Sequence, residues 1–383
     1  MIYREAEKEL IKLSTQFRAV AITGPRQSGK TTLVRKVFPD KQYANLENPD
    51  TRRFAIEDPR GFLSNYPGGA VLDEVQRVPD LFSYLQQILD ESEEKGLFIL
   101  TGSNNFLLQE SISQSLAGRV GYLFLLPLSL KEIGGREMDN NQILFQGGYP
   151  ELYHEHADIT RFYANYIRTY IERDVRLLKN ITDLYAFERF LRLCAGRVGQ
   201  LLNMNSMAAE VGVDVKTIGS WIGVLETSFI VFRLQPYHKN YKKRIVKMPK
   251  LYFYDTGLAV ALMGLESVSQ LSISPFRGAL FENLVIVEFL KRLYNNGKTN
   301  NLFFWRDNTG NEIDLVLEKG NNSVPIEIKS GQTVAEEFFK GIHFWNKLTD
   351  EKGGFLIYGG NSFQKRSNGI AVVPLRDLNS MEI

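Results

Sequence analysis

The sequence predicts an α/β protein in which a parallel sheet with helices is followed by smaller domains. Three observations support this: a strand that runs into a glycine-rich loop, a helix-turn-helix pattern near residue 210, and one helix before three strand-like runs from residue 277. The 383 residues also exceed what one hydrophobic core usually organises. We predict a first domain at 1–135, a helical connector or lid at 136–180, and further domains at 181–265 and 266–383.

Composition and charge are those of a globular chain. Hydrophobic residues make up 44% and charged residues 23%, and the net charge is +2, so a coat protein for nucleic acid is disfavoured while local basic patches are allowed. The single cysteine, Cys194, cannot form an internal disulfide, which fits a reducing compartment. The start of the chain is charged, and the apolar stretch broken by Pro127 is too short to span a bilayer. We therefore expect a cytoplasmic protein without membrane contact.

The first motif is a loop that fits phosphate. A short apolar strand at 18–23 leads into a helix that begins near Lys30. Between them Gly24 and Gly29 let backbone amides point at phosphate, Lys30 can reach the β- and γ-phosphates, and the Thr31 hydroxyl can ligate Mg²⁺. An ordinary glycine-rich turn is the alternative, which the strand and helix context disfavours. The predicted nucleotide-binding residues are Gly24, Pro25, Arg26, Gln27, Ser28, Gly29, Lys30, Thr31 and Thr32.

A second apolar strand, "GGAVLDEVQ", ends in Asp73 and Glu74. An aspartate at such a strand end can hold Mg²⁺ through water, and the next glutamate can polarise the water that attacks the γ-phosphate. Alone, this pair is usually a solvated strand end. After a complete phosphate loop it predicts hydrolysis as well as binding, with Glu74 as the general base.

Polar residues at the end of the strand "LFILTGS" would reach the same edge of a parallel sheet. Thr101, Ser103 or Asn104 could there sense the γ-phosphate. Next, "SISQSLAGRV" predicts a helix that leads to Arg119. Here the chain resembles the AAA+ branch of P-loop ATPases, and the resemblance implies that Arg119 acts on the nucleotide of a neighbouring subunit, which requires a homo-oligomer. A helix-end arginine favoured by the helix dipole is the alternative.

The nucleotide is predicted to be ATP, because no Asn-Lys-x-Asp segment that would read guanine follows the loop. The stretch 158–179 then predicts a long charged helix that links domains. "GGYPE" near Gly147 and "TYIERDV" near Thr169 resemble the signature of a prokaryotic ATPase family whose carboxyl-terminal half is uncharacterised.

The block from 201 to 237 predicts a helix-turn-helix followed by a strand, which a winged helix fits best. Ser206 is the expected cap of a first helix, Gly212 ends it, and Asp214 caps a second helix through Leu225. In a DNA-binding winged helix the exposed start of the second helix, with Lys216, would meet the groove. Thr217 and Ser220 lie on the same start of the helix.

A run of basic residues follows and supports a nucleic-acid surface. Its members are Lys239, Lys242, Lys243, Arg244, Lys247 and Lys250, with Tyr241 among them. We expect DNA contact through Lys216, Lys242, Lys243 and Arg244. The alternative is a winged helix that packs only against its own protein.

The carboxyl-terminal part combines one amphipathic helix with three strands. It places Glu282 on the helix, Asp314 on the second strand, and Glu327 and Lys329 on one face of the third. This arrangement resembles the PD-(D/E)XK nuclease fold, and the resemblance implies that Glu282, Asp314 and Glu327 bind Mg²⁺ while Lys329 helps to position or activate water. A surface ion pair would explain Glu327 and Lys329 but not the other two carboxylates.

The sequence thus predicts a P-loop sheet of the AAA+ type followed by a winged helix and a small restriction-endonuclease-like domain. The leading functional hypothesis is a Mg²⁺-dependent ATPase that acts on or near DNA. Its catalytic residues would be Lys30, Glu74 and Arg119, with Glu327 and Lys329 in the nuclease-like domain. The alternatives are a nucleotide-gated scaffold with an inactive nuclease-like domain and an ATPase that regulates protein partners only. His154 and His156 miss the spacing of a zinc protease and predict no metal site.

Overall fold

The computed structural model describes residues 2–103, 108, 112, 115–134, 138–154, 157–175, 181, 183–238 and 246–381, with only the backbone at 172–175. These residues form two compact units. Unit 1 comprises Met1–Leu128, Thr227–Phe229 and Lys291–Thr299, and unit 2 comprises Ser129–Glu226, Ile230–Leu290 and Asn300–Ile383. The domain boundaries expected near residues 135, 180 and 265 stay predictions.

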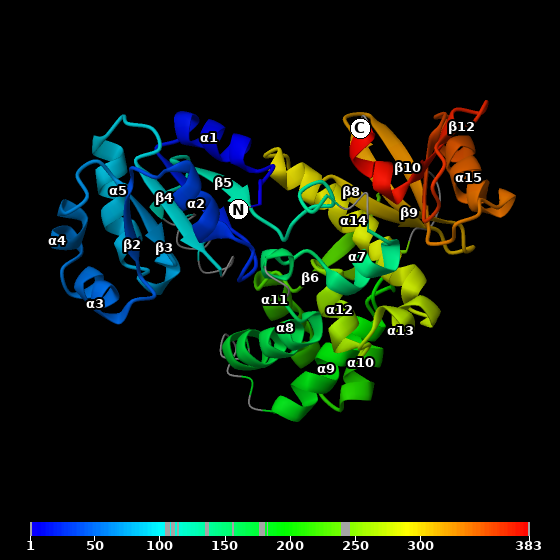
Figure 1. Ribbon diagram of the computed structural model, residues 1–383, viewed down its shortest axis with the longest axis horizontal. Helices are drawn as coiled ribbons and strands as arrows, with labels where there is room; N and C mark the ends of the chain where they lie inside the picture. The colour runs from blue at the N-terminus through cyan, green and yellow to red at the C-terminus, as the bar shows by residue number, and fades with distance from the viewer. Residues whose placement is uncertain are drawn as a thin grey trace. The chain divides into compact units, whose positions relative to one another are not determined.

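Unit 1 is built on a five-stranded parallel sheet (Figure 1). In spatial order its strands are β2 (Gln42–Asn45), β3 (Ala70–Asp73), β4 (Phe98–Gly102), β1 (Ala19–Thr23) and β5 (Val120–Phe124). Every residue of β1, β3 and β4 is buried, as expected for parallel strands covered on both faces. The predicted parallel sheet with helices is confirmed.

Two described helices of unit 1, α3 and α4, begin with both a side-chain cap and a proline. Asn48 accepts from the backbone amides of Asp50 and Thr51 at the start of α3, and Asp58 accepts from Gly61 at the start of α4; a proline occupies the first position of each helix. The described helices of unit 1 are α1 (Glu7–Gln16), α2 (Lys30–Val37), α3 (Pro49–Glu57), α4 (Pro59–Ser64), the short η1 (Val75–Arg77) and α5 (Leu81–Glu91).

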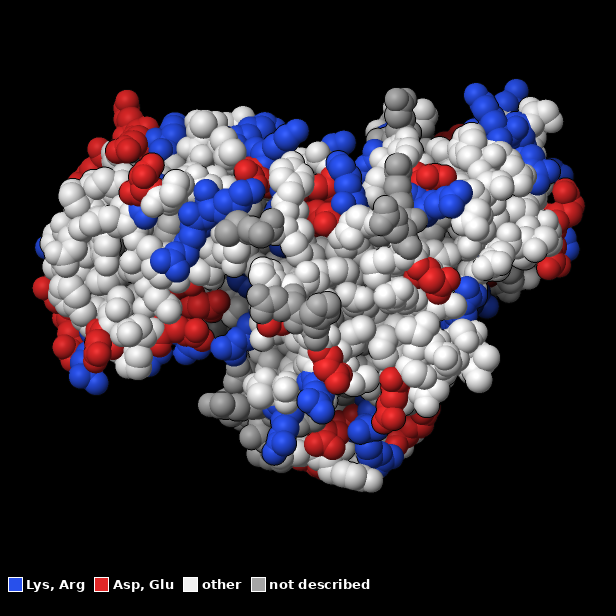
Figure 2. Space-filling view, in the orientation of Figure 1, with Lys and Arg blue, Asp and Glu red and all other residues white. Residues whose placement is uncertain are grey.

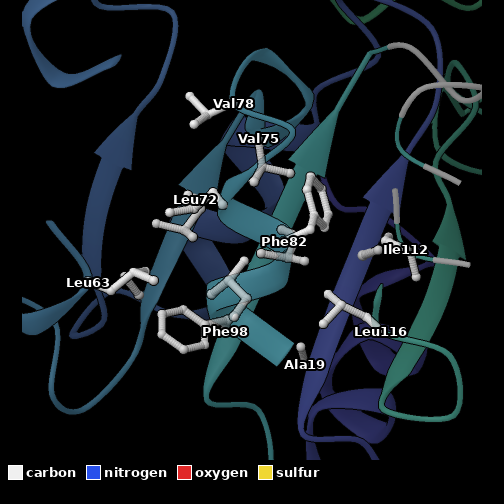
Figure 3. Close-up of a cluster of buried hydrophobic side chains, with 14 of the residues drawn as sticks. Ala19, Leu63, Leu72, Val75, Val78, Phe82, Phe98, Ile112 and Leu116 are labelled. Carbon is white, nitrogen blue, oxygen red and sulfur yellow. The ribbon is translucent and has the colours of Figure 1, made fainter. Parts of the chain in front are cut away.

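Two hydrophobic clusters cover the two faces of this sheet. Alternate residues of β1 divide between them: Ala19 and Ala21 point to one face, and Val20 and Ile22 to the other. The first cluster contains side chains of α4 and α5, such as Phe82, together with Leu72 and Phe98 of the sheet (Figure 3). The second contains Leu10 and Leu13 of α1 with Leu33 and Val34 of α2. This packing fixes the loop between β1 and α2 at the sheet edge.

Helices dominate the middle of the chain. The predicted helix at 158–179 is α8 continued by a π-helix, η3, to Val175, and residues 176–180 lie outside the described ranges. The elements from residue 140 are α7 (Asn140–Gln146), η2 (Pro150–Tyr153), α8 (Ile159–Tyr166), η3 (Ile167–Val175), α9 (Leu184–Gly196), α10 (Met204–Val211), α11 (Val215–Thr227), α12 (Thr256–Leu262), α13 (Val268–Ile273) and α14 (Arg277–Asn295).

The helix-turn-helix elements occur in the predicted order, with one changed cap. Asn203 caps α10 by accepting from the Ser206 amide, so the expected cap at Ser206 was wrong; the helix begins one turn earlier than the serine suggested. Gly212 ends α10 with φ 81°, and Asp214 accepts from the Thr217 amide at 2.9 Å. The assignment of these elements to a winged helix stays a prediction.

An eight-stranded sheet organises the rest of unit 2. Its order is β12-β13-β11-β10-β9-β8-β6-β7, and β6 pairs in parallel with β8, so strands from both sides of the expected boundary at 265 share one sheet. The predicted helix and three strands are present as α14, β8, β9 and β10. The remaining bounds are β6 (Val231–Pro236), β7 (Lys250–Phe253), β8 (Leu302–Arg306), β9 (Glu312–Lys319), β10 (Asn322–Lys329), η4 (Glu336–Phe339), α15 (Lys340–Thr349), β11 (Gly354–Tyr358), β12 (Gln364–Lys365), β13 (Ile370–Pro374) and η5 (Leu375–Ser380).

Candidate functional site

The loop between β1 and α2 has the backbone conformations that a phosphate cradle needs. Gly24, Gln27 and Gly29 have φ values of 153°, 63° and 91°, and Gly29 forms the left-handed start of α2. A Cβ on Gly24 would lie 2.1 Å from the backbone oxygen of Leu125, so only glycine fits there. The amides of a loop in these conformations converge on one point, where an anion can bind.

Lys30 supplies a buried positive charge to this loop. Its Nζ donates to the backbone oxygens of Gly24 at 2.9 Å and Pro25 at 2.8 Å. No carboxylate of the described residues lies within ion-pair distance of it, and burial lowers its pKa to about 8 against the opposing charges of Glu74 and Asp73. The buried Ser28 hydroxyl in the same loop also has no hydrogen-bond partner among the described atoms. The Lys30 ammonium and the Ser28 hydroxyl could both donate hydrogen bonds to a bound phosphate.

Asp73 is the last residue of β3, beside this loop, and accepts hydrogen bonds from three hydroxyl groups. Its carboxylate accepts from Thr31 Oγ1 at 3.0 Å, from Tyr43 OH at 2.5 Å and from Thr101 Oγ1. Burial, and then the hydrogen bond to Asp73, raises the pKa of Tyr43. Three strands and the first turn of α2 therefore hold one carboxylate next to the hydroxyl expected to ligate Mg²⁺.

Glu74 follows Asp73 in a left-handed conformation with φ 56°, which turns its side chain from the strand direction. Its Oε2 accepts from Gln76 Nε2 at 2.6 Å and from Ser103 Oγ at 2.8 Å. Thr101 thus contacts Asp73 at the end of β3, and Ser103 contacts Glu74, which follows it. The predicted γ-phosphate sensor Asn104 lies outside the described residues.

Glu47, which lies outside the phosphate loop, forms ion pairs with two arginines, one of them in the loop. Glu47 Oε1 pairs with Arg26 Nη2 at 3.2 Å and with Arg77 Nη2 at 3.0 Å, and each of these side chains is about 40% exposed. Arg26 was predicted as a loop residue, whereas Glu47 and Arg77 were missed. No pattern in the sequence joins them, because they meet only when β2 and β3 pair.

Arg119 lies at the other end of the sheet from the phosphate loop. It precedes β5, which runs parallel to β1 with Ala19 opposite Val120, and the loop follows the far end of β1. Its guanidinium forms a bidentate ion pair with Asp90, in which Nε donates to Oδ1 and Nη2 lies 3.0 Å from Oδ2. The five residues of β1 separate it from the loop of its own chain by roughly 16 Å, so the predicted role on a neighbouring subunit stays a prediction.

Unit 2 brings the four predicted nuclease-like residues into one cluster. Lys329 Nζ lies 3.0 Å from Asp314 Oδ2 and 2.9 Å from Glu327 Oε2. Burial and the charge of Asp314 raise the pKa of Glu282 on α14 against the opposing charge of Lys250. Burial and the charge of Asp314 raise the pKa of Glu327 well above its usual range, whereas Lys329 and Lys250 overcome burial and lower the pKa of Asp314.

Lys250 and Tyr252 of β7 complete this cluster. Lys250 Nζ lies 3.1 Å from Glu282 Oε1 and 2.6 Å from Glu312 Oε1, and Tyr252 OH donates to Glu282. The expectation that Lys250 belongs to a basic DNA-binding surface was therefore wrong, since the pairing of β7 with β6 buries it to 4% exposure. The alternation of Lys250 and Tyr252 along β7 is the signal that could have identified them.

The carboxylates of this cluster do not form a metal centre by themselves. Across the part of the chain that the structure describes, no three or more His, Cys, Asp or Glu side chains are arranged to hold a metal ion. Each predicted ligand, Glu282, Asp314 and Glu327, contacts a lysine instead. Their role as metal ligands stays a prediction that this arrangement disfavours.

The predicted DNA-contacting residues are only partly described. Lys216 and Ser220 are exposed on the first turns of α11, and Thr217 bonds the capping Asp214. Lys242, Lys243 and Arg244 lie outside the described residues. On the face shown in Figure 2, basic and acidic side chains are interspersed. Within the described ranges, no helix combines the length and apolar character needed to cross a membrane.

Comparison with known proteins assigns the first part of the chain to a class. A family model described as an AAA domain matches residues 16–134, the part that contains the parallel sheet and the phosphate loop. Two models described as domains of unknown function, DUF8612 and DUF4143, match residues 138–269 and 277–378. The fold and the site thus define a protein with an AAA-type P-loop ATPase domain.

The chain belongs to the same family as the uncharacterized protein Rv2008c of Mycobacterium tuberculosis. The two are 32% identical over 336 residues, which cover 86% of this chain and 74% of that protein. An uncharacterized protein of Haemophilus influenzae is 23% identical over 300 residues, covering 73% of this chain and 70% of that protein.

Solved structures with 13% identity include two ATP-related proteins. The Walker-type ATPase PABY2304 of Pyrococcus abyssi has a TM-score of 0.42 and covers 67% of this chain and 94% of its own. AMPPCP-bound DnaA of Aquifex aeolicus has a TM-score of 0.30 and covers 58% of this chain and 85% of its own.

Proposed function

We propose that this protein binds ATP with Mg²⁺ and hydrolyses it at the loop between β1 and α2. The observation that carries the proposal is the buried Lys30 ammonium, held by two loop carbonyl oxygens and without a carboxylate partner in the described part of unit 1. A buried charge without a counter-ion is costly, and a triphosphate would compensate it. The AAA-domain match over the same residues supports the assignment.

The side chains around the loop would have different roles in the reaction. Lys30 would hold the β- and γ-phosphates, and Thr31 with Asp73 would hold Mg²⁺, which when bound neutralises charge on the phosphate oxygens. Glu74 would orient the attacking water and take its proton. Ser103 and Gln76 fix the Glu74 carboxylate, and Arg119 would act on the nucleotide of a neighbouring subunit.

Two substitutions separate binding from hydrolysis. Lys30→Ala is expected to lose binding of a fluorescent adenine nucleotide, because the loop then has no buried cation. Glu74→Gln is expected to keep that binding and to lose at least about a hundredfold in turnover, since general-base catalysis contributes on this order. Lys36→Ala, which loses an ion pair with Glu7 and a contact with the ring of Tyr3, is the control. Equal titrations of Lys30→Ala and the parent would remove the proposal.

Unit 2 has two candidate functions. It acts on or near DNA through the exposed start of α11 with Lys216, or it docks a protein partner without cutting nucleic acid. The ion pair of the buried Lys250 with the predicted metal ligand Glu282 favours a domain that does not cut. Digestion of plasmid DNA with Mg²⁺ tests whether unit 2 cleaves DNA. Equal digestion by the parent and by Asp314→Ala would show that this cluster cuts nothing.

A further inference from the structure

Lys250 occupies the centre of the carboxylate cluster in unit 2. It is the first residue of β7 and only 4% exposed. Its Nζ lies 3.1 Å from Glu282 and 2.6 Å from Glu312, and 5.5 Å from the ring centre of Phe304. A buried ammonium is stable only when anionic partners replace its lost water, and these two carboxylates do so.

The cluster as a whole contains its own cations. Lys329 contacts Asp314 and Glu327 on the side of β10. Arg306 Nη1 contacts the second oxygen of Glu312 at 3.3 Å. Each of the four carboxylates therefore has a lysine or arginine of this chain within ion-pair distance, and three cations together offset most of their charge without an added ion.

The carboxylate oxygens of this cluster already have close protein neighbours. A Cβ on Gly341 of α15 would lie 2.1 Å from Glu327 Oε1, and that side chain is 7% exposed. Tyr252 OH donates to the Glu282 oxygen that Lys250 contacts. Mg²⁺ usually keeps several waters and needs octahedral oxygen ligands, so such an ion would have to displace these protein groups.

We infer that Lys250 is an internal counter-ion that takes the place of a divalent metal between Glu282 and Glu312, so that the nuclease-like cluster is a metal-free structural centre. The lysine joins β7 to α14 and β9 through charge, as a metal would join them through coordination. Unit 2 then keeps the fold of a nuclease-like domain without metal-dependent cleavage. This inference is independent of nucleotide binding in unit 1.

Replacement of the lysine tests the inference, because Lys250→Met removes the charge and keeps much of the volume. Its unfolding, followed by fluorescence of the three tryptophans, all of them in unit 2, is expected to occur at a lower temperature than in the parent. Millimolar Mn²⁺ is expected to raise that temperature for Lys250→Met and to leave the parent unchanged. Electron paramagnetic resonance should count one more bound Mn²⁺ in the variant than in the parent.

Two controls isolate the cluster. Lys247→Met removes an exposed lysine of the same segment and should behave as the parent. The double variant Lys250→Met with Glu282→Gln removes both charges, so it should unfold closer to the parent and gain no response to Mn²⁺.

Two outcomes would overturn the inference. One is a Lys250→Met protein that folds but binds no additional Mn²⁺. The other is a parent that binds Mn²⁺ and loses it on Glu282→Gln, which would show a metal site despite the lysine. This second comparison needs no variant of Lys250, so it decides the question even when Lys250→Met does not fold.

Discussion

Two buried lysines of this protein have opposite surroundings. Lys30 is held by carbonyl oxygens, and burial lowers its pKa to about 8. For Lys250, burial also opposes the charge, but Tyr252, Glu282 and Glu312 outweigh it and raise the pKa well above its usual value. The physical difference is the counter-ion: a lysine that has one stabilises the fold, and a lysine that lacks one is ready for a ligand.

The pKa of Lys30 predicts how nucleotide affinity depends on pH. A bound triphosphate raises this pKa, so the contribution of the charged lysine is complete below about pH 8 and is lost as pH rises through the higher pKa of the complex. We expect affinity for a fluorescent ATP analogue to be constant below pH 8 and to weaken above it by up to about tenfold per pH unit. Fluorescence titrations between neutral pH and the range above the Lys30 pKa measure this.

Lys30→Met is the control for this titration, because this variant has no ammonium in the loop and any binding that remains at high protein concentration should show no break near the pKa of Lys30. A parent whose affinity is the same throughout would mean that Lys30 is not the group that meets the phosphates.

At the scale of the elements, a glycine turn joins three helices of unit 2. Gly148, just after α7, donates its amide to Asp255 Oδ2 at 2.7 Å, and Asp255 Oδ1 caps α12 by accepting from Leu258 at 2.9 Å. Tyr163 of α8 lies 2.7 Å from the same Oδ1. The "GGYPE" segment therefore has a structural role: its backbone satisfies a buried carboxylate between α7, α8 and α12.

Gly147→Ala is expected to destabilise unit 2. Gly147 has φ 69°, and a Cβ there would lie 2.3 Å from Tyr163 OH and 2.5 Å from Asp255 Oδ1. With ψ −160° this backbone lies in a region that essentially only glycine adopts, which costs alanine about 1 to 3 kcal/mol, and disturbed hydrogen bonds to a buried carboxylate add about 1 to 3 kcal/mol. Urea unfolding followed by tryptophan fluorescence measures the sum.

Gly264→Ala is the matched control, because Gly264 has φ 75° and nothing within 4 Å of an added Cβ. It should cost only the backbone term, about 1 to 2 kcal/mol. Equal losses in the two variants would mean that the contacts of Gly147 with Tyr163 and Asp255 contribute nothing.

At the scale of the whole molecule, the proposed ATP turnover and the predicted DNA contact belong to different units. The phosphate loop lies in unit 1 and the exposed start of α11 in unit 2. If ATP hydrolysis drives an action on DNA, ATP binding and DNA binding must be linked energetically. Such linkage is reciprocal: if DNA changes the affinity for ATP, ATP changes the affinity for DNA by the same factor.

We expect double-stranded DNA to raise ATP turnover of the parent, and Lys216→Glu to reduce both this stimulation and filter binding of DNA. The triple reversal of Lys242, Lys243 and Arg244 should weaken binding further and lower its salt dependence, as expected when phosphate contacts are removed. Turnover without DNA should be the same in all three proteins. If DNA does not change the rate of ATP turnover and the parent does not bind DNA, the protein-partner alternative is favoured.

Much of unit 1 could be predicted because its signals are local. The strand, loop and first helix turn from Arg18 to Lys30 are contiguous, and their order alone implies the cradle. Asp73 was found for the same reason, as the end of an apolar strand. Asn203 was missed as a cap because Ser206 fits the same local rule equally well.

The sequence by itself determined the phosphate loop, the two carboxylates at the end of β3 and the alternation that places Glu327 beside Lys329. Only the tertiary structure decided that Tyr43 bonds Asp73 and that Lys250 lies between Glu282 and Glu312. The physical reason is that local periodicity fixes which face of a strand or helix a side chain occupies, whereas strand order and register, set by long-range packing, decide which faces meet.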